Sequence, residues 1–348
     1  MKKKLLAALA ALVVAAGAFA QNFPAYFKMS GTVITGCDKD EIPDDLVIPG
    51  GVTEIGRNAF AECTYLESVV IPDSVKKIGE GAFKSSTSLK SVTIPDGVTE
   101  IGENAFNNCA SLESIRIPEG ITEIRYGTFA KCTSLVSVTI PGNVKTTAST
   151  KAYFDSLGAF QGCTSLKSVV IAGGVEEIGG SAFSGCTSLA SVTIANSVTK
   201  IGGGAFWGCK SLEGISIPDS VNEIGGAAFR GSGLKTVTIP KGVKKIDERT
   251  FNECTSLESV TLTRGVAEIG KSVFRDCNSL KTVSVPRSVT KIGDGAFLAS
   301  DYDFDLTVQF DGTKTQWEAI KKEDSYFVGN IGTFAVKCTD GEFDKRGW

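Results

Sequence analysis

The side chains of this chain that could do chemistry are its ten cysteines and its 39 carboxylates, because histidine is absent from all 348 residues. The absence removes the commonest general base, the Ser–His and Cys–His nucleophile pairs and the commonest zinc ligand. Paired carboxylates could still act as acid and base, but no Asp or Glu stands out from the repeating position that it occupies. We therefore expect no catalytic residue, no metal site and no cofactor.

The cysteines follow a pattern that favours packing over reactivity. Eight of them occupy the third position after a phenylalanine: Cys63, Cys109, Cys132, Cys163, Cys186, Cys209, Cys254 and Cys277. Ser86, Ser232 and Ser300 occupy the same position elsewhere. Exchange with serine indicates a small buried side chain. Equivalent cysteines of adjacent repeats would also point in the same direction, which does not suit a disulfide between them. Incidental oxidation in an exported protein is the alternative.

Cys37 and Cys338 lie outside this pattern, one near each end of the chain. With about twelve stacked strands at ~4.8 Å each, they would be roughly 50 Å apart. They cannot then pair within one molecule, and their redox state stays open.

Three acidic residues, Asp301, Asp303 and Asp305, alternate like the start of a calcium-binding loop. The glycine that such a loop requires is replaced by Leu306, and Gly312 stands where a bidentate acid is needed. The calcium interpretation therefore fails at two informative positions. Acidic residues near a terminal coil also discourage edge-to-edge aggregation.

These residues sit in a repeat of 23 residues, C-T-S-L-K-S-V-x-I-P-x-x-V-x-x-I-G-x-x-A-F. Its phenylalanines are Phe60, Phe83, Phe106, Phe129, Phe160, Phe183, Phe206, Phe229, Phe251, Phe274 and Phe297. A period of 20 to 29 residues around an L-x-x-[VI]-x-I core is typical of a leucine-rich-repeat solenoid. Such solenoids usually present surfaces that contact other molecules.

One repeat illustrates the expected local structure. Leu66, Val69 and Ile71 should point inward and Ser68 and Val70 outward, as the two-residue period of a strand requires. A proline then ends the strand, and a second short extended piece and a phenylalanine complete the coil.

A single coil buries too few apolar side chains to be stable alone, so neighbouring coils must share one core. The sequence predicts an α/β leucine-rich-repeat solenoid that is predominantly β. It should contain about eleven 23-residue coils with short strands and short helical turns, plus a cap at each end.

The chain divides into four expected parts. Residues 1–20 have a basic start, an apolar stretch and Ala18-Phe19-Ala20, so we expect a signal peptide cleaved before Gln21. Residues 21–45 form an N-terminal cap, 46–310 the solenoid and 311–348 a C-terminal capping segment. No later run approaches the length of a membrane span. The expected product is exported, secreted or held at the cell surface, by a means that the sequence does not specify.

The run from Ile94 to Leu112, I-P-x-x-V-x-x-I-G-x-x-A-F-x-x-C-x-S-L, resembles the BspA-like class of leucine-rich repeats found on bacterial and some protist surfaces. The resemblance covers about Leu46 to Phe310. A weaker resemblance to the closing segment of such proteins extends from Gly312 to Gly341. The family implies surface attachment: binding to host matrix or cell-surface proteins or to other bacterial surface molecules. Glycans are a further possible partner. It brings no catalytic residues.

The outward strand positions form two columns of mostly small hydroxyl side chains. These columns either suit closely stacked strands or provide a ligand face for extended protein or glycan chains. We expect Thr139 and Thr193 in these columns to be candidates for ligand contact. Arg116 is a third candidate, because it is the only charged residue in either column.

Two other features could make contacts. Trp207 follows Phe206 at a position where other repeats have smaller or polar residues, and exposed tryptophan is favoured at contact hot spots. An eight-residue insertion before Phe160 places Tyr153 and Phe154 in a loop. Neutral drift is the alternative for the loop, and cover for a neighbouring coil is the alternative for Trp207.

The sequence thus predicts a non-catalytic exported protein that mediates adhesion or protein–protein interaction. The mildly acidic charge is evenly spread, which argues against a nucleic-acid partner. A structural surface scaffold is one alternative, and a carboxylate-based glycan-acting enzyme is a second.

Overall fold

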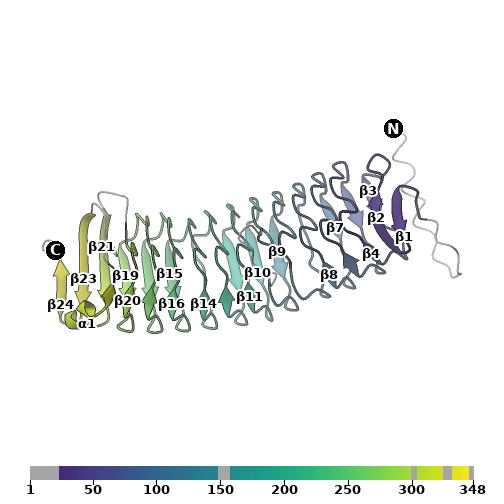
Figure 1. Cartoon of the computed structure of the whole chain (residues 1–348). Coiled ribbons are helices and arrows are strands. Elements are labelled where there is room, and N and C mark those ends of the chain that lie inside the picture. The colour runs from purple at the N-terminus through teal and green to yellow at the C-terminus, as the bar shows by residue number, and fades with distance from the viewer. Residues whose placement is uncertain (1–22, 148–156, 299–303, 324–330, 345–348) are drawn as a thin grey trace.

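The computed structural model describes residues 23–147, 157–298, 304–323 and 331–344. Its coils follow one another and form an elongated solenoid with the first and last strands, β1 and β24, at opposite extremities (Figure 1). Each coil has three sides: a longer strand, a two-residue strand and a side made of turns. The predicted predominantly β solenoid is confirmed.

The longer strands form the first side and run parallel in register, so that Ser68 lies beside Ser91 and Val70 beside Thr93. They are β3 (Asp45–Val47), β5 (Ser68–Val70), β7 (Ser91–Thr93), β9 (Ser137–Ile140), β10 (Ser168–Ile171), β12 (Ser191–Ile194), β15 (Thr236–Ile239), β17 (Ser259–Leu262), β19 (Thr282–Val285), β21 (Phe304–Phe310) and β23 (Ile331–Cys338). They make three sheets, interrupted at residues 114–117 and 214–217, where no strand forms. We call their solvent-exposed side the strand face.

The two-residue strands form the second side. They are β4 (Glu54–Ile55), β6 (Lys77–Ile78), β8 (Glu100–Ile101), β11 (Glu177–Ile178), β13 (Lys200–Ile201), β14 (Glu223–Ile224), β16 (Lys245–Ile246), β18 (Glu268–Ile269), β20 (Lys291–Ile292) and β22 (Lys321–Lys322). In all but β22 the second residue is a buried isoleucine and the first a charged residue. These charged residues form ion pairs between coils: the Lys200 Nζ, for example, lies 3.6 Å from the Glu177 Oε1 and 3.2 Å from the Glu223 Oε1.

The third side differs from the expected short helical turns. Alternate residues donate backbone hydrogen bonds to the next coil: the Phe60 amide to the Ala82 carbonyl at 2.7 Å and the Glu62 amide to the Lys84 carbonyl at 2.7 Å. Because these amides donate to the neighbouring coil, they cannot form the hydrogen bonds within one segment that a helix requires. Glu62 and its equivalents adopt left-handed φ angles to do so. Within the described residues the one helix is α1 (Lys314–Glu318), near the C-terminus.

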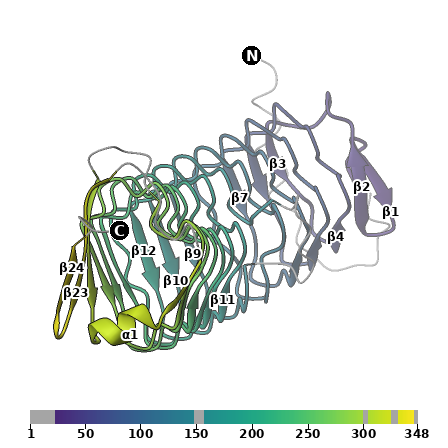
Figure 2. The same ribbon diagram turned by 60° about the vertical axis from the view of Figure 1, so that its left-hand side comes forward.

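The ends of the solenoid are closed by hairpins. At the N-terminal end β1 (Phe27–Ser30) pairs antiparallel with β2 (Val33–Cys37), which continues the second side by pairing with β4. At the C-terminal end β23 pairs antiparallel with β24 (Gly341–Asp344). Figure 2 shows both hairpins at the extremities of the stack. Each hairpin covers apolar side chains that a terminal coil would otherwise expose.

The core is organised by a stack of the eleven repeat phenylalanines. Successive rings lie 5.2–5.8 Å apart between centroids and nearly parallel, with interplanar angles of 4–17°. All are at most 2% exposed. Phe27 from the N-terminal hairpin meets Phe60 edge-on at 6.0 Å and ends the stack. The inward strand residues Leu66, Val69 and Ile71 are buried as predicted.

The repeat cysteines are free and buried, which confirms the packing interpretation. The structure adds a specific role: each thiol from Cys109 onward donates to the carbonyl of the phenylalanine in the preceding coil, as from Cys109 to Phe83 at 3.1 Å. The Ser86 hydroxyl donates to the Phe60 carbonyl at 2.8 Å in the same way. Serine and cysteine therefore interchange because both are small and both satisfy a buried carbonyl.

Cys37 lies outside the repeating cysteine position, as predicted, but next to the first member of that series. Its sulfur lies 3.5 Å from the sulfur of Cys63, the first cysteine of the series. The hairpin of β1 and β2 brings it there by packing on the first coil. Cys338, at the end of β23, is half-buried.

Removing one ring from the stack tests the coil register. Phe183→Ala should lower the free energy of unfolding by about 3–5 kcal/mol, because it leaves a cavity between coils. Chemical denaturation followed by circular dichroism measures the loss. Tyr65→Ala is the matched control, since Tyr65 is 76% exposed and its loss should cost less than about 0.5 kcal/mol. A loss under about 1 kcal/mol for Phe183→Ala contradicts the register.

Burial also protects the cysteines from reagents. It raises the pKa of the Cys109 and Cys186 thiols to about 12, and the thiolate is the reactive form. Thiol labelling of the native protein near neutral pH should therefore modify few of Cys109, Cys132, Cys163, Cys186 and Cys209. Mass spectrometry should find all five labelled after denaturation, and fast labelling of the native protein is the contrary result.

Candidate functional site

The strand face presents the two predicted columns of outward side chains to solvent. The first runs Asp45, Ser68, Ser91, Ser114, Ser137, Ser168, Ser191, Gly214, Thr236, Ser259, Thr282 and Thr307. The second runs Val47, Val70, Thr93, Arg116, Thr139, Val170, Thr193, Ser216, Thr238, Thr261, Ser284, Gln309 and Lys337. Inward neighbours such as Val169 and Ile171 are buried, so the outward side chains have solvent as their surroundings.

Thr139 and Thr193 form one row with the residue between them. The register of β9, β10 and β12 places Val170 beside Thr139 on one side and Thr193 on the other. Both threonines are exposed, and Val170 is 41% exposed. The row therefore offers two hydroxyl groups flanking an apolar side chain on a fixed backbone.

Exposed valines give the strand face an apolar component. Val47 and Val70 are cross-strand neighbours and are 57% and 44% exposed. Val136, before β9, is 44% exposed. The second column thus changes from valine at the N-terminal end, through threonine and serine, to Gln309 and Lys337 at the C-terminal end. Extending the column before the first full repeat could have found Val47.

Arg116 is not a free cation on this face. Its guanidinium donates to both carboxylate oxygens of Asp96, at 2.6 and 3.2 Å, and these hydrogen bonds lower the pKa of Asp96. Asp96 also accepts from the Glu119 amide at 3.4 Å. The charge of Arg116 is compensated within the protein, so it offers a ligand less than its isolation in the column suggested.

Trp207 lies on the turn side and is separated from the strand face. It is 46% exposed, and the guanidinium of Arg230 lies 5.1 Å from the centroid of its ring. Arg230 also pairs with Glu253 at 2.6 Å. Trp207 therefore does not belong to one site with Thr139 and Thr193. Tyr153 and Phe154 lie outside the described residues.

The strand face is interrupted at the coil that precedes the shortened repeat. Phe229 and Phe251 are 22 residues apart, and the preceding segment 214–217 forms no strand. Ile215 and Ile217 remain half-buried there, as do Val192 and Ile194 on the neighbouring β12. The interruption adds partly exposed aliphatic surface to the centre of the strand face.

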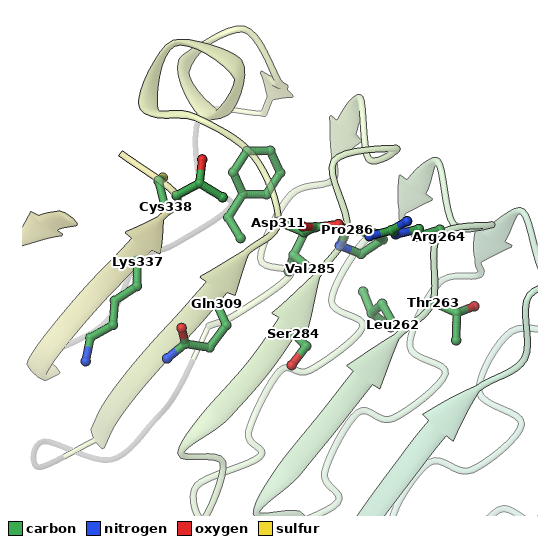
Figure 3. A pocket seen from close by; sticks show the side chains of 12 residues that line it. Leu262, Thr263, Arg264, Ser284, Val285, Pro286, Gln309, Asp311, Lys337 and Cys338 are labelled. Carbon is green, nitrogen blue, oxygen red and sulfur yellow. Dashed lines mark ion pairs between the residues drawn. The ribbon is translucent and has the colours of Figure 1, made fainter. Parts of the chain in front are cut away.

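An open groove of about 610 Å³ lies at the C-terminal end of the strand face. It is lined where β17, β19, β21 and β23 end, and Figure 3 shows Ser284, Gln309 and Lys337 side by side on neighbouring strands. Arg264 and Asp311 form an ion pair at 3.4 Å across its edge. Sequence analysis missed the groove because β21 and β23 belong to a segment without the repeat. Lys337 and the neutral donors Ser284 and Gln309 could hold a negatively charged polar group in this groove.

A second groove of about 390 Å³ lies over the two-residue strands. Lys77 lies 3.6 Å from Glu54 and 3.8 Å from Glu100, and Arg125 pairs with Glu100 at 2.7 Å. Most of its charges are therefore paired with one another within the protein.

Within the described ranges, no cluster of three or more cysteine, aspartate or glutamate residues is arranged to hold a metal ion. Asp301 and Asp303 of the rejected calcium pattern lie outside those ranges. Among the described helices, none has the length and apolar character to cross a membrane.

Comparison with known proteins identifies the repeat. The family model for the BspA type leucine rich repeat region matches residues 53–156, 156–227 and 176–303. Among curated protein sequences, none matches the chain.

Two solved structures share the fold, and a third is similar in sequence. A leucine-rich repeat protein from Bacteroides ovatus ATCC 8483 is 26% identical with a TM-score of 0.52, covering 89% of this chain and 97% of that one. One from Eubacterium ventriosum ATCC 27560 is 22% identical with a TM-score of 0.50, covering 89% and 92%. A leucine rich cell surface protein from Faecalibacterium prausnitzii A2-165 is 28% identical with a TM-score of 0.44, covering 86% and 96%.

Proposed function

We propose, given that the chain belongs to the BspA type leucine-rich-repeat family, that it is an exported protein whose strand face binds a partner protein at a cell surface. Members of this class of repeats act by contact with other proteins. Adhesion to a host matrix or cell-surface protein, or to another bacterial surface molecule, is the proposed outcome.

The observation that carries this proposal is the composition of the strand face. Its columns combine hydroxyl groups, which donate and accept hydrogen bonds, with exposed valines such as Val70 and Val170. These short side chains lose little rotamer freedom on binding, and the backbone beneath them is fixed by the sheet. An extended polypeptide laid across the columns would meet equivalent groups at intervals of about 4.8 Å.

Export is supported by the sequence of residues 1–20, with three lysines, an apolar stretch and small residues before Gln21. The cysteines are compatible with export because they are buried, so an oxidising compartment would leave most of them unchanged. To stay at the cell surface after export, the protein would need to bind another surface molecule. The strand face could make that contact.

A glycan is the second candidate ligand, and the C-terminal groove favours it. Ser284, Gln309 and Lys337 offer neutral and cationic hydrogen-bond donors on adjacent strands. Such a set suits a sugar that carries a carboxylate or sulfate group. An enzymatic role has less support, because acids on either side of the same coil, such as Glu54 and Glu100, are both paired with the lysine between them, Lys77.

The binding face can be tested with matched substitutions. Thr139→Glu combined with Thr193→Glu should abolish binding to a partner found by screening the purified protein against matrix proteins and glycans. The melting temperature should stay within a few degrees, because exposed changes cost less than about 0.5 kcal/mol. Surface plasmon resonance measures binding.

Thr99→Glu with Thr199→Glu is the control, since both threonines are exposed on another side of the coils. Tyr153→Ala with Phe154→Ala should also leave binding unchanged. Loss of binding in that insertion variant, with binding kept after the changes at Thr139 and Thr193, places the contact in the insertion.

A further inference from the structure

A line of charged and small residues follows the strand face where each strand has turned away after its proline or an equivalent residue. It consists of the third residue after each second-column position from Val70 to Ser284, and we call it the turn ridge: Asp73, Asp96, Glu119, Gly142, Gly173, Asn196, Asp219, Lys241, Arg264 and Arg287. Its charged members are all exposed. The ridge spans ten coils, or about 40 Å at the spacing of parallel strands.

The order of charges along the turn ridge is self-complementary. Its first three members are acidic, the next three are uncharged, Asp219 follows, and the last three are basic. When two copies of the ridge are laid side by side in opposite directions, each acidic member of one copy lies beside a basic member of the other. The pairs are Asp73 with Arg287, Asp96 with Arg264, and Glu119 with Lys241. The remaining acid, Asp219, meets Gly142, and Gly173 meets Asn196. No two like charges oppose each other.

The coil spacing keeps this complementarity in register. The eight-residue insertion leaves β9 and β10 paired residue by residue, so Gly142 and Gly173 belong to adjacent coils. The one-residue deletion is absorbed likewise, since the Lys235 amide still donates to the Glu213 carbonyl at 2.9 Å. The residues directly after the ridge are serine or glycine in nine of the ten coils and Asn143 in the other, so a second surface can approach closely.

Intramolecular ion pairs do not prevent such an approach. Asp96 is paired with Arg116 at 2.6 Å, Lys241 with Asp219 at 3.3 Å and Arg264 with Asp311 at 3.4 Å. The side chains of all three pairs are 45% to 76% exposed. Exposed pairs of this kind contribute little and can exchange partners. Within the described residues no ion pair involves Asp73, Glu119 or Arg287.

We infer that two copies of this chain associate antiparallel along the turn ridge, with a two-fold axis between Gly173 and Asn196. A two-fold axis brings the same surface of both copies together, so that surface must be complementary to itself in the opposite direction. The charged positions of the ridge meet this requirement except Asp219, which lies opposite a glycine. Six intermolecular ion pairs result, three on each side of the axis. The proposal is independent of the ligand of the strand face.

Charge exchange tests the antiparallel pairing. The purified protein should sediment as a dimer at about 0.05 M salt and as a monomer at about 1 M, where the screening length falls to about 3 Å. One variant, Arg264→Glu with Arg287→Glu, and a second, Asp73→Lys with Asp96→Lys, should each be monomeric at low salt. An equimolar mixture of the two variants should form a one-to-one dimer, because every opposed pair then regains opposite charges.

Lys84→Glu with Lys210→Glu is the control, since it changes the net charge as the first variant does on exposed residues away from the ridge. It should remain dimeric at low salt. A wild-type chain that is monomeric at low salt, or two ridge variants that fail to associate when mixed, overturns the proposal. Binding of the last three, basic members of the ridge to an acidic polymer without self-association overturns it as well.

A second inference rests on the contact between Cys37 and Cys63. Their sulfurs are 3.5 Å apart, and they join the N-terminal hairpin to the first coil. Both side chains are nearly buried, at 9% and 3% exposed. The hydrogen bond between them lowers the pKa of Cys37 and raises that of Cys63, so Cys37 is the better nucleophile.

We propose that an external disulfide converts this pair into a disulfide that fastens the cap. Cys37 gives its proton to solvent, and its thiolate attacks one sulfur of the external disulfide and releases the other as a thiolate. Cys63 then loses its proton and attacks the Cys37 sulfur, which releases the second external thiolate. Two protein thiols are oxidised and one external disulfide is reduced.

Oxidation by glutathione disulfide tests the cross-link in the purified protein, whatever compartment it occupies. Peptide mapping without reductant should find Cys37 joined to Cys63, while Cys109 and Cys132 stay alkylatable after unfolding. Cys63→Ser should abolish the cross-linked peptide and leave glutathione attached to Cys37. Recovery of Cys37 and Cys63 as free thiols, or their linkage to other cysteines, overturns the proposal.

Discussion

The structure depends on the contact between each coil and the next. A coil of 23 residues buries few side chains of its own, so its stability comes from neighbours that cover its apolar residues above and below. Three ladders make this contact at once: backbone hydrogen bonds on all three sides, the stack of phenylalanine rings, and the thiols that reach back to the preceding coil. Each ladder needs the same spacing, which explains why the repeat tolerates little change in length.

The stack also determines where variation is allowed. Inward positions are held to leucine, valine, isoleucine and phenylalanine, whereas the outward columns can change residue by residue without disturbing the core. The strand face thereby acquires a gradient from valine to Gln309 and Lys337, and the turn ridge a gradient from acid to base. A solenoid can thus carry two independent surface patterns along one scaffold.

Much of this fold could be predicted from periodicity alone. The spacing from Phe60 to Phe297 gives the coil number, and the alternation at Leu66, Val69 and Ile71 gives the inward positions. The turns of the third side could not be predicted, because their hydrogen bonds run to another coil and leave no local pattern. The position of Cys37 was missed for a similar reason, since a hairpin without the repeat brings it to Cys63.

The candidate site was predictable in part. The columns containing Thr139 and Thr193 follow from strand alternation, but the Asp96 partner of Arg116 sits 20 residues earlier and beyond the strand, where alternation says nothing. The C-terminal groove depends on β21 and β23, whose sequences differ from the repeat.

Site-specific photocrosslinking on intact cells tests the central claim, that a partner contacts the strand face, most directly. A benzophenone side chain at Val170 should form a covalent adduct with a partner protein, and one at Lys84, on the turn side, should not. Adducts at Lys84 without adducts at Val170 would contradict the account.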